Sequence, residues 1–477
     1  MFKRVLLIAP PSSSYLGAVR PPTGLGYVAQ ALHESGIEYA VHDMRARHSL
    51  SMLRQKIASY EPDLIGLSLV SFEYKRSYEL IRDIKKLRPS AATCVGGIHV
   101  SVLGETVLEE CPDIDFGIVH EGEQAIVQLC RGEAPLDEMQ GLLYRHNGEV
   151  IAGPPPDSIM DLDSVSFPRY VGFELGRYAR ERPLITSRGC PYRCIFCPNS
   201  IRAKRFRARS AENVVDEIEY WYSRGIRQFN VDDDNFTLIK ERVYDICSEI
   251  ERRGLSGLFI RCANGLRADR VDRDLLARMK EVGFKEVAFG ADGGNNRVLQ
   301  EIVHKGETIE DIEGAITDAC DLGLRVKLFI IVGSPGETMS DIEDSIALAQ
   351  RYPIEWLHMN NPIPYPGTEL YEWVRSHDAF VIPPEEYLNG VCETDTTPVF
   401  ETAELSRETR EQILVRCRKI EKMVKRRAVE RMFRRLPGIN KLAGWLFASR
   451  FGQWLFFKNV FARSLINRIW YMKMMRD

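Results

Sequence analysis

The sequence has few cysteines and no long apolar run. Its 11 cysteines in 477 residues are too sparse for a disulfide scaffold, and no stretch approaches the ~18 to 20 apolar residues of a membrane-spanning helix. The first apolar run, Val5 to Ala9, is shorter than the core of a signal peptide. A disulfide-rich secreted protein and a membrane-spanning protein are therefore excluded, and we expect a protein of the reducing cytoplasm.

Basic residues are not in excess over the whole chain. The 64 Lys and Arg residues face 67 Asp and Glu residues, which gives a formal net charge of -3 and excludes a globally basic nucleic-acid binder. Residues 414–477 differ, because their 17 bases and three acids give a charge of +14. We expect no nucleic-acid partner, and we treat residues 377–477 as a separate basic, aromatic and helical region.

The first 147 residues alternate short apolar segments with helical patterns. Five such units, from Val5–Ala9 to Phe116–Val119, predict a doubly wound, flavodoxin-like α/β domain with a parallel sheet. Ligands bind such sheets beyond the carboxyl ends of the strands, where this sequence is small, polar and rich in glycine. The candidate residues in these segments are Ser13, Ser68, Ser71, Gly97, His99 and Glu121.

A second alternating series follows a linker. Residues 148–180 include Pro154-Pro-Pro156 and keep no regular period, which is typical of a linker. Residues 181–376 contain six further βα units, which favours a partial (β/α)6 barrel over a second open sheet. Barrel enzymes carry their chemistry at the C-terminal strand ends, so we expect the site in those loops.

The loop after the first strand of the second series carries three closely spaced thiols. Cys190, Cys194 and Cys197 have CxxxCxxC spacing, which allows three thiolates to bind one iron-sulfur cube and leave one iron without a protein ligand. Structural zinc normally has four ligands, and no fourth Cys or His lies within ten residues of this trio. Zinc and three unrelated buried thiols remain the alternatives.

This motif resembles the signature of the radical S-adenosylmethionine (SAM) enzymes, with Phe196 as the aromatic residue before the last cysteine. Later segments resemble further landmarks of that family in the same order: Phe206–Ser210, Val231–Phe236, Phe289–Gly294 and Phe329–Thr338. The resemblance implies a 4Fe-4S cluster whose open iron binds SAM, and cleavage of SAM to a 5'-deoxyadenosyl radical.

The resemblance also implies roles for three acids. Asp233 and Asp234 would accept hydrogen bonds from the methionine ammonium, with a helix N-cap pair as the alternative. Asp292 would accept from the ribose hydroxyls, although many relatives carry Glu-Ser where this chain has Asp292-Gly293. The turn Gly333–Glu337 is either purely structural or an adenine contact.

Together with this module, the N-terminal domain resembles the cobalamin-binding class of radical SAM enzymes. Gly96-Gly-Ile-His99 and Asp115–Glu123 carry the resemblance. It implies that Gly97 allows close approach of cobalamin, that the serines offer hydroxyls and that Glu121 lies at the cofactor. His99 is equally well explained as a satisfied loop histidine. No DxHxxG motif occurs, so we expect no cobalt-binding histidine of that kind; an empty domain is the alternative.

The basic end of the chain allows two interpretations. Residues 411–435 have the period of an amphipathic helix, and Trp445–Tyr471 is dense in aromatic residues. Through residues 414–477 the chain either lies on the inner face of the membrane as a peripheral protein or packs these aromatics over the barrel. The membrane interpretation favours a lipid-like substrate.

The function that we expect is radical methylation of an unactivated carbon in a lipid-like or natural-product substrate. A reductant such as flavodoxin or ferredoxin would supply the electron. The alternatives are a cobalamin-assisted radical cyclase or oxidoreductase and, in a different class, a non-catalytic metal-binding sensor module.

Overall fold

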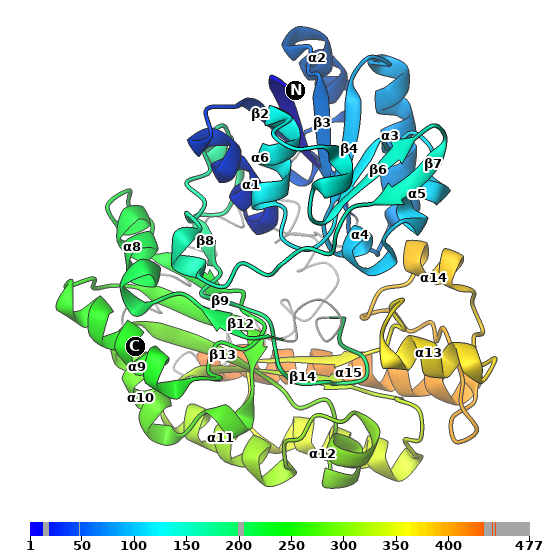
Figure 1. Cartoon of the computed structure of the whole chain (residues 1–477). Helices are drawn as coiled ribbons and strands as arrows, with labels where there is room; N and C mark the ends of the chain where they lie inside the picture. The colour runs from blue at the N-terminus through cyan, green and yellow to red at the C-terminus, as the bar shows by residue number, and fades with distance from the viewer. Residues whose placement is uncertain (13–18, 47, 199–204, 434–440, 442–443, 445–477) are drawn as a thin grey trace.

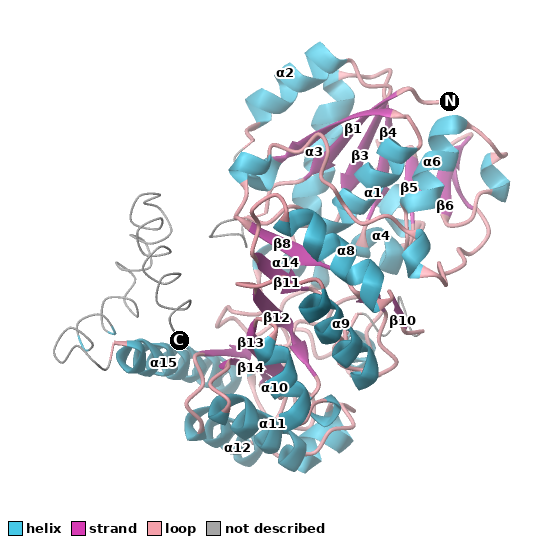
Figure 2. Ribbon diagram, turned by 90° about the vertical axis from the view of Figure 1, so that its left-hand side faces the viewer, coloured by secondary structure: helices cyan, strands magenta, loops and turns pink. Residues whose placement is uncertain are grey.

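The computed structural model describes residues 1–12, 19–46, 48–198, 205–433, 441 and 444. An N-terminal α/β domain lies above an open barrel in Figure 1. The side view in Figure 2 shows the strands of the two sheets stacked one above the other. Among the described residues, no helix has both the length and the apolar character needed to cross a membrane.

The N-terminal domain is built on a seven-stranded sheet of order β2-β1-β3-β4-β5-β6-β7. Its first five strands pair in parallel, and their order is that of flavodoxin-like folds, which confirms the prediction. The strands are β1 (Arg4–Ala9), β2 (Glu38–Asp43), β3 (Leu64–Ser68), β4 (Ala92–Gly96), β5 (Phe116–Ile118), β6 (Leu142–His146) and β7 (Glu149–Ala152).

Helices cover both faces of this sheet because successive side chains of a strand point to opposite sides. Val5 and Leu7 of β1 join one hydrophobic core, whereas Leu6 and Ile8 join another. Helices α1 and α6 pack on the first core, and α2, α3 and α5 pack on the second. The helices are α1 (Thr23–Glu34), α2 (Leu50–Tyr60), α3 (Tyr74–Leu87), α4 (Ile98–Leu103), α5 (Thr106–Glu110) and α6 (Glu123–Arg131).

The predicted linker, residues 148–180, begins too early, because its first residues form a strand of the N-terminal sheet. Strand β7 lies inside it and pairs antiparallel with β6, which itself pairs antiparallel with β5. The turn between β6 and β7 is Asn147-Gly148, and both residues have positive φ, 52° and 88°. Asn-Gly favours tight hairpin turns of this kind, so the sequence does carry the signal that the linker prediction overlooked.

The second domain is a partial barrel of six parallel strands, as predicted. Its order is β15-β14-β13-β12-β11-β8, and every neighbouring pair is parallel. The strands are β8 (Glu181–Leu184), β11 (Gln228–Val231), β12 (Phe259–Leu266), β13 (Phe284–Gly290), β14 (Arg325–Ile331) and β15 (Trp356–Asn360). The outer helices are α8 (Ala211–Tyr222), α9 (Lys240–Arg252), α10 (Arg273–Glu281), α11 (Ile309–Asp321) and α12 (Met339–Arg351).

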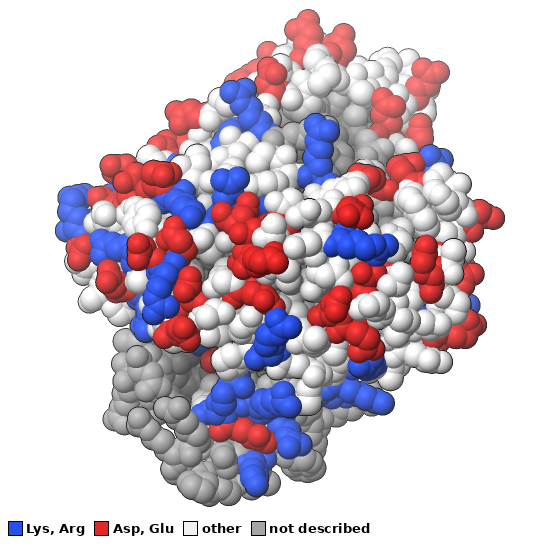
Figure 3. All heavy atoms as spheres, turned by 90° about the horizontal axis from the view of Figure 1, so that it is seen from below, with Lys and Arg blue, Asp and Glu red and all other residues white. Residues whose placement is uncertain are grey.

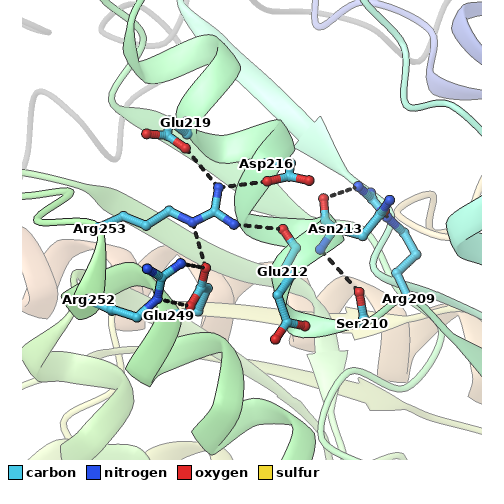
Figure 4. Close-up of polar contacts among 9 residues, drawn as sticks. All are labelled: Arg209, Ser210, Glu212, Asn213, Asp216, Glu219, Glu249, Arg252 and Arg253. Carbon is cyan, nitrogen blue, oxygen red and sulfur yellow. Dashed lines mark hydrogen bonds and ion pairs between the residues drawn. The ribbon is translucent and has the colours of Figure 1, made fainter.

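Polar contacts fix the outer helices α8 and α9 to each other (Figure 4). Arg253, directly after α9, forms ion pairs of 2.7 Å with both Asp216 and Glu219 of α8 and of 2.6 Å with Glu249. Helix α8 begins after Ser210, whose hydroxyl accepts a hydrogen bond from the Asn213 N–H at 3.2 Å. These contacts connect two neighbouring helices in the outer layer of the barrel.

The C-terminal segment connects the two domains. Helix α14 (Pro384–Gly390) packs on α3, and the Leu388 carbonyl accepts a hydrogen bond of 2.8 Å from the Glu73 N–H. Tyr387 and Phe400 join the core that β1, α2 and α3 share. Helix α13 (Glu369–Ser376) precedes α14.

The long helix α15 (Arg407–Met432) covers the free edge of β15. The Glu421 carboxylate accepts a hydrogen bond of 2.8 Å from the Met359 N–H, and Arg418 donates to the Met359 carbonyl. These side chains satisfy an edge-strand backbone that has no further strand beside it. Up to Met432 the helix shows the amphipathic period predicted over residues 411–435, with Ile413, Leu414, Cys417, Ile420 and Val424 buried. Residues 434–435 and the predicted aromatic segment Trp445–Tyr471 lie outside the described residues.

Candidate active site between the two sheets

The three cysteines lie in the loop that connects the two strands of a short antiparallel ribbon. Strand β9 (Ser187–Arg188) precedes the loop and pairs with β10 (Arg207–Ala208) after it. The thiols of Cys190, Cys194 and Cys197 are half-buried, and the Cys197 N–H donates to the Cys194 carbonyl at 3.0 Å. The ribbon thus holds all three cysteines at the barrel end that faces the N-terminal domain.

The donor set of the loop, three half-buried thiols, is the one expected for an iron-sulfur cluster with one open iron. Burial raises the pKa of Cys190, and it raises the pKa of Cys194 to about 12, against the opposing effect of the Lys305 cation. Buried thiols with such pKa values become thiolates when a cationic centre binds them. Within the described part of the chain, no three His, Cys, Asp or Glu side chains gather closely enough to hold a single metal ion.

Buried charges stand beside the cysteine loop. The Lys305 ammonium lies 2.6 Å from the Asp292 carboxylate and 3.4 Å from that of Glu307. Arg267 donates to the Lys305 carbonyl at 2.8 Å and lies 3.4 Å from the ring centre of Tyr192, inside the loop. One oxygen of Asp292 is therefore engaged by Lys305, and the ribose contact expected of Asp292 stays a proposal.

The two acids after β11 have different surroundings. Asp233 is buried and accepts hydrogen bonds from the Thr186 N–H (2.6 Å), the Thr186 hydroxyl (2.5 Å) and the Ser187 hydroxyl (2.6 Å). Both oxygens of Asp233 are thus engaged within the barrel. Asp234 lines the cavity described below and accepts from the Gly189 N–H at 3.3 Å. The contacts of these two acids with the methionine ammonium stay predictions.

A cavity of about 430 Å³ lies where the strand ends of the two domains face each other. Ser68, Gly97 and Glu121 line it from the N-terminal domain, and Arg188 and Asp234 line it from the barrel. Gly189, at the start of the cysteine loop, also lines the cavity. The floor on the N-terminal side is lined mainly by glycines and apolar side chains, which leave room for close approach of a ligand: Gly66, Leu67, Cys94, Gly96 and Ile118.

Another hollow, of about 590 Å³, opens on the outer surface between α8 and α9. Its charged side chains pair with one another, for example Arg252 with Glu249 at 2.6 Å (Figure 4). The cavity at the strand ends therefore remains the candidate active site, in agreement with the expected location.

Gly97 is the rim position at which only glycine fits. Its φ is 101°, and a Cβ atom there would lie 2.5 Å from the Leu69 carbonyl oxygen and 3.1 Å from the Leu69 nitrogen. This combination of conformation and close backbone contact excludes other residues. Gly97 lines the cavity, and the close approach of cobalamin expected there stays a prediction.

His99 and Ser71 do not line the cavity, which corrects the expectation that they contact the cofactor. The His99 ring is fully buried, stacks on Tyr74 at 4.8 Å and pairs with the Tyr78 hydroxyl at 3.1 Å and the Ser71 hydroxyl at 3.3 Å. Burial lowers the pKa of His99 to about 4, so the ring is neutral at physiological pH. Of the other expected residues, Ser13 lies outside the described residues, and Phe196 packs against the core beneath the N-terminal sheet.

Glu121 lines the cavity but is bound by the barrel. Its two carboxylate oxygens accept from Arg188 and Arg207, both at 2.8 Å. Burial would raise the pKa of Glu121, but the hydrogen bonds from Arg207 and Arg188 outweigh it and lower the pKa. Sequence reasoning overlooked both arginines, although their positions at the two ends of the cysteine loop were a usable signal.

Comparisons with known proteins agree with this geometry. Residues 184–349 match the family model of the radical SAM superfamily, and residues 15–130 match that of the B12 binding domain. An uncharacterized methyltransferase of Pyrococcus horikoshii is 30% identical over 383 residues, which cover 78% of this chain and 83% of the relative. The chain belongs to the cobalamin-binding radical SAM family.

Two further comparisons show the range of this family. The anaerobic magnesium-protoporphyrin IX monomethyl ester cyclase of Rubrivivax gelatinosus is 27% identical over 371 residues, covering 74% of this chain and 66% of the cyclase. The cobalamin-dependent SAM radical enzyme OxsB, solved with aqua-cobalamin and SAM bound, superposes with a TM-score of 0.72 at 16% identity, covering 98% of this chain and 75% of OxsB. As a radical SAM family member with a B12 binding domain, the chain is an enzyme rather than a non-catalytic sensor module.

Proposed function

We propose that this enzyme methylates an unactivated carbon of a lipid-like or natural-product substrate. The observation that carries the proposal is the cavity of about 430 Å³ that the B12 binding domain and the cysteine loop line together. When bound, the cluster supplies the electron that cleaves SAM, and cobalamin supplies a transferable methyl group. A shared cavity lets one substrate carbon meet both reactive centres.

The residues of the chain bind and orient the reactants in this proposal. Cys190, Cys194 and Cys197 hold the cluster, and Asp234 accepts hydrogen bonds from the methionine ammonium. Asp233 keeps the strand end rigid through its three hydrogen bonds to Thr186 and Ser187. The Lys305 ammonium, 2.6 Å from Asp292, holds the carboxylate that we assign to the ribose hydroxyls.

The walls of the cavity serve to exclude water. Leu67 and Ile118 lie on the side of the N-terminal domain and Ile185 on the side of the barrel. A primary carbon radical abstracts hydrogen from whatever it meets, so a dry cavity is needed for a selective reaction.

A mass-spectrometric experiment tests methylation directly. Anaerobically reconstituted protein is supplied with cobalamin, flavodoxin and its reductase, and SAM that carries a trideuteromethyl group, together with a lipid extract. The proposal expects a product that gains one trideuteromethyl group in exchange for a hydrogen, with release of 5'-deoxyadenosine. The variant Cys194→Ser is the control, and label that appears equally in both samples would contradict the proposal.

A cyclase or oxidoreductase reaction is the second candidate, because a cyclase is among the relatives. The same experiment separates the two reactions. Cyclisation or oxidation releases 5'-deoxyadenosine and removes hydrogen from the substrate without adding the labelled methyl group.

We further propose that the basic C-terminal region brings the enzyme to the inner face of the membrane. Seven bases of α15 are exposed, namely Arg407, Arg416, Lys419, Lys422, Arg426, Arg427 and Arg431. Lys and Arg side chains gather along one edge of the view from below in Figure 3, and such clusters attract anionic lipid headgroups. Deletion of residues 441–477 combined with Lys419→Glu, Lys422→Glu and Arg427→Glu should abolish flotation with anionic liposomes, whereas unchanged flotation would contradict this part of the proposal.

A further inference from the structure

Four charged side chains join the rim of the N-terminal domain to the two ends of the cysteine loop. Arg188 ends β9 and Arg207 begins β10, and these two residues are paired across the ribbon. Arg188 lies 2.8 Å from Glu121 and 2.7 Å from Glu123, and Arg207 lies 2.8 Å from Glu121. We call these four residues the interdomain clamp.

The clamp is largely shielded from water. The side chains of Arg188 and Glu121 are each 17% exposed, that of Glu123 is 11% exposed and that of Arg207 is 4% exposed. The Arg188 guanidinium also lies 4.8 Å from the ring centre of Tyr27 on α1. Ion pairs with this degree of burial are strong and directional, in contrast to ion pairs on an exposed surface.

Further hydrogen bonds leave Glu121 and Arg207 little freedom. The second oxygen of Glu121 also accepts from the Ile159 N–H at 3.0 Å, and Arg207 donates to the Ile159 carbonyl at 2.7 Å. The segment between the two domains therefore contacts both Glu121 and Arg207 through the backbone of Ile159. Glu121 has two cationic partners and one backbone donor, so its carboxylate already has a structural role.

The position of the clamp connects the two halves of the site. Glu121 lies between β5 and α6 and Glu123 is the first residue of α6, both at the edge of the cavity on the side of the B12 binding domain. Arg188 and Arg207 bound the loop that carries all three cysteines. A displacement of these carboxylates would therefore move the ends of the cysteine loop relative to the cavity floor.

From this geometry we propose that Glu121, assisted by Glu123, is a positioning residue that sets the distance between the cluster and the cobalamin. This inference rests on the proposed function, since it requires both cofactors in one molecule. It replaces the cofactor contact that the sequence predicted for Glu121. Radical and methyl transfers depend steeply on distance, and a misplacement of about 1 Å can lower a rate roughly 100-fold.

The test measures the geometry directly and needs no substrate. The reduced cluster and cob(II)alamin are both paramagnetic, so their magnetic interaction reports the distance between them by electron paramagnetic resonance. The variant Glu121→Gln retains the size of the side chain but loses its charge. With cluster and cobalamin contents as in the wild type, we expect a changed spin interaction and a fall of roughly 10- to 100-fold in methyl transfer from labelled SAM to cobalamin.

A matched control and a second variant complete the design. Glu355 forms an ion pair of 2.6 Å with Arg325 entirely within the barrel, at side-chain exposures of 31% and 23%, so Glu355→Gln should leave the spin interaction unchanged. Arg188→Lys keeps the charge but can no longer bridge Glu121 and Glu123, and it serves if Glu121→Gln fails to fold. We expect Arg188→Lys to change the spin interaction as well.

The outcomes distinguish the clamp from the proposed function. An unchanged spin interaction in both clamp variants would overturn the positioning role. Loss of cobalamin from Glu121→Gln with an intact cluster would also overturn it, because Glu121 would then be a cobalamin ligand. Wild-type protein that takes up the cluster but no cobalamin would contradict the proposed function instead.

Discussion

The two sides that face each other across the cavity differ in composition. On the side of the N-terminal domain the floor consists largely of glycines and apolar side chains, with Gly97 packed against the backbone of Leu69, and the carboxylates of Glu121 and Glu123 stand at its edge, where barrel arginines bind them. The barrel rim carries buried charges, including Asp233 beside Arg242 at 3.7 Å and Asp292 beside Lys305 at 2.6 Å.

This difference follows the chemistry of the cofactors that each rim would hold. A large flat macrocycle needs room and close backbone approach, which glycine provides. A cluster of thiolates and a zwitterionic sulfonium need fixed charges and hydrogen bonds in a dry site. Single substitutions should therefore act differently on the two sides. On the side of the N-terminal domain they should cause steric clashes, and on the barrel side they should remove a charge or a ligand.

The largest effect is expected on the barrel side when a cysteine of the loop is replaced. Cys194→Ser removes one of three ligands, so iron should fall from about four to less than about one atom per chain. Release of 5'-deoxyadenosine should fall to background. Iron analysis and chromatography measure both quantities. The control is Cys320→Ser, a half-buried cysteine outside the loop; equal iron in both variants would contradict the assignment of the ligands.

On the opposite rim, Gly97→Ala should weaken cobalamin binding and leave the cluster intact. The added Cβ would lie 2.5 Å from the Leu69 carbonyl oxygen at a φ of 101°, which costs about 1–3 kcal/mol. We expect a loss of about tenfold in cobalamin affinity, measured by titration in the visible spectrum. Gly36 has a φ of 69° and no atom within 4 Å of its Cβ position, so Gly36→Ala should bind cobalamin like the wild type.

The two acids after β11 have different proposed roles: Asp234 binds SAM, and Asp233 supports the fold. Asp234→Asn should raise the Kd for SAM about tenfold, because a charge-assisted hydrogen bond is lost. Asp233→Asn should instead lower the stability of the fold by about 2–4 kcal/mol and leave the Kd of the folded protein unchanged. Calorimetry and guanidinium unfolding separate the two effects, and the reverse pattern would show that their roles are exchanged.

The last prediction concerns the pH dependence of stability at the turn after β14. Burial raises the pKa of Glu337 to about 7 from an ordinary value of 4.5, while its carboxylate accepts from the Gly333 and Ser334 N–H groups. A raised carboxyl pKa contributes stability fully below about pH 4.5, and this contribution is lost as the pH rises through about 7. The stability of the wild type relative to Glu337→Gln should therefore decrease by about 3 kcal/mol or less between pH 5 and pH 8, as guanidinium midpoints would reveal. A pH-independent difference would contradict this assignment.

Regular patterns allowed most of the fold to be predicted from the sequence. Apolar strands such as Val5–Ala9 and the helices between them determined the five-strand order and the six-strand barrel, because both follow from period and spacing. The hairpin β6–β7 was overlooked. The proline run Pro154-Pro-Pro156 favoured a linker that begins at residue 148, although Asn147-Gly148 is a signal for a hairpin turn.

The site was predictable where spacing within one loop defines it, as for Cys190, Cys194 and Cys197. Residues whose roles depend on long-range partners were not predictable. Asp233 is engaged by Thr186 and Ser187, 47 and 46 positions earlier, and Glu121 by arginines 67 and 86 positions later. Such distances carry no periodic signal, so tertiary contact alone decides which acids remain available to a cofactor.

The most direct test of the central claim is to count both cofactors in the same protein. Air-free reconstitution with iron, sulfide and cobalamin should give about four irons and one cobalamin per chain, with labelled methyl passing from SAM to the bound cobalamin. A protein that takes up the cluster and cleaves SAM, yet holds no cobalamin and transfers no methyl group, would contradict the account.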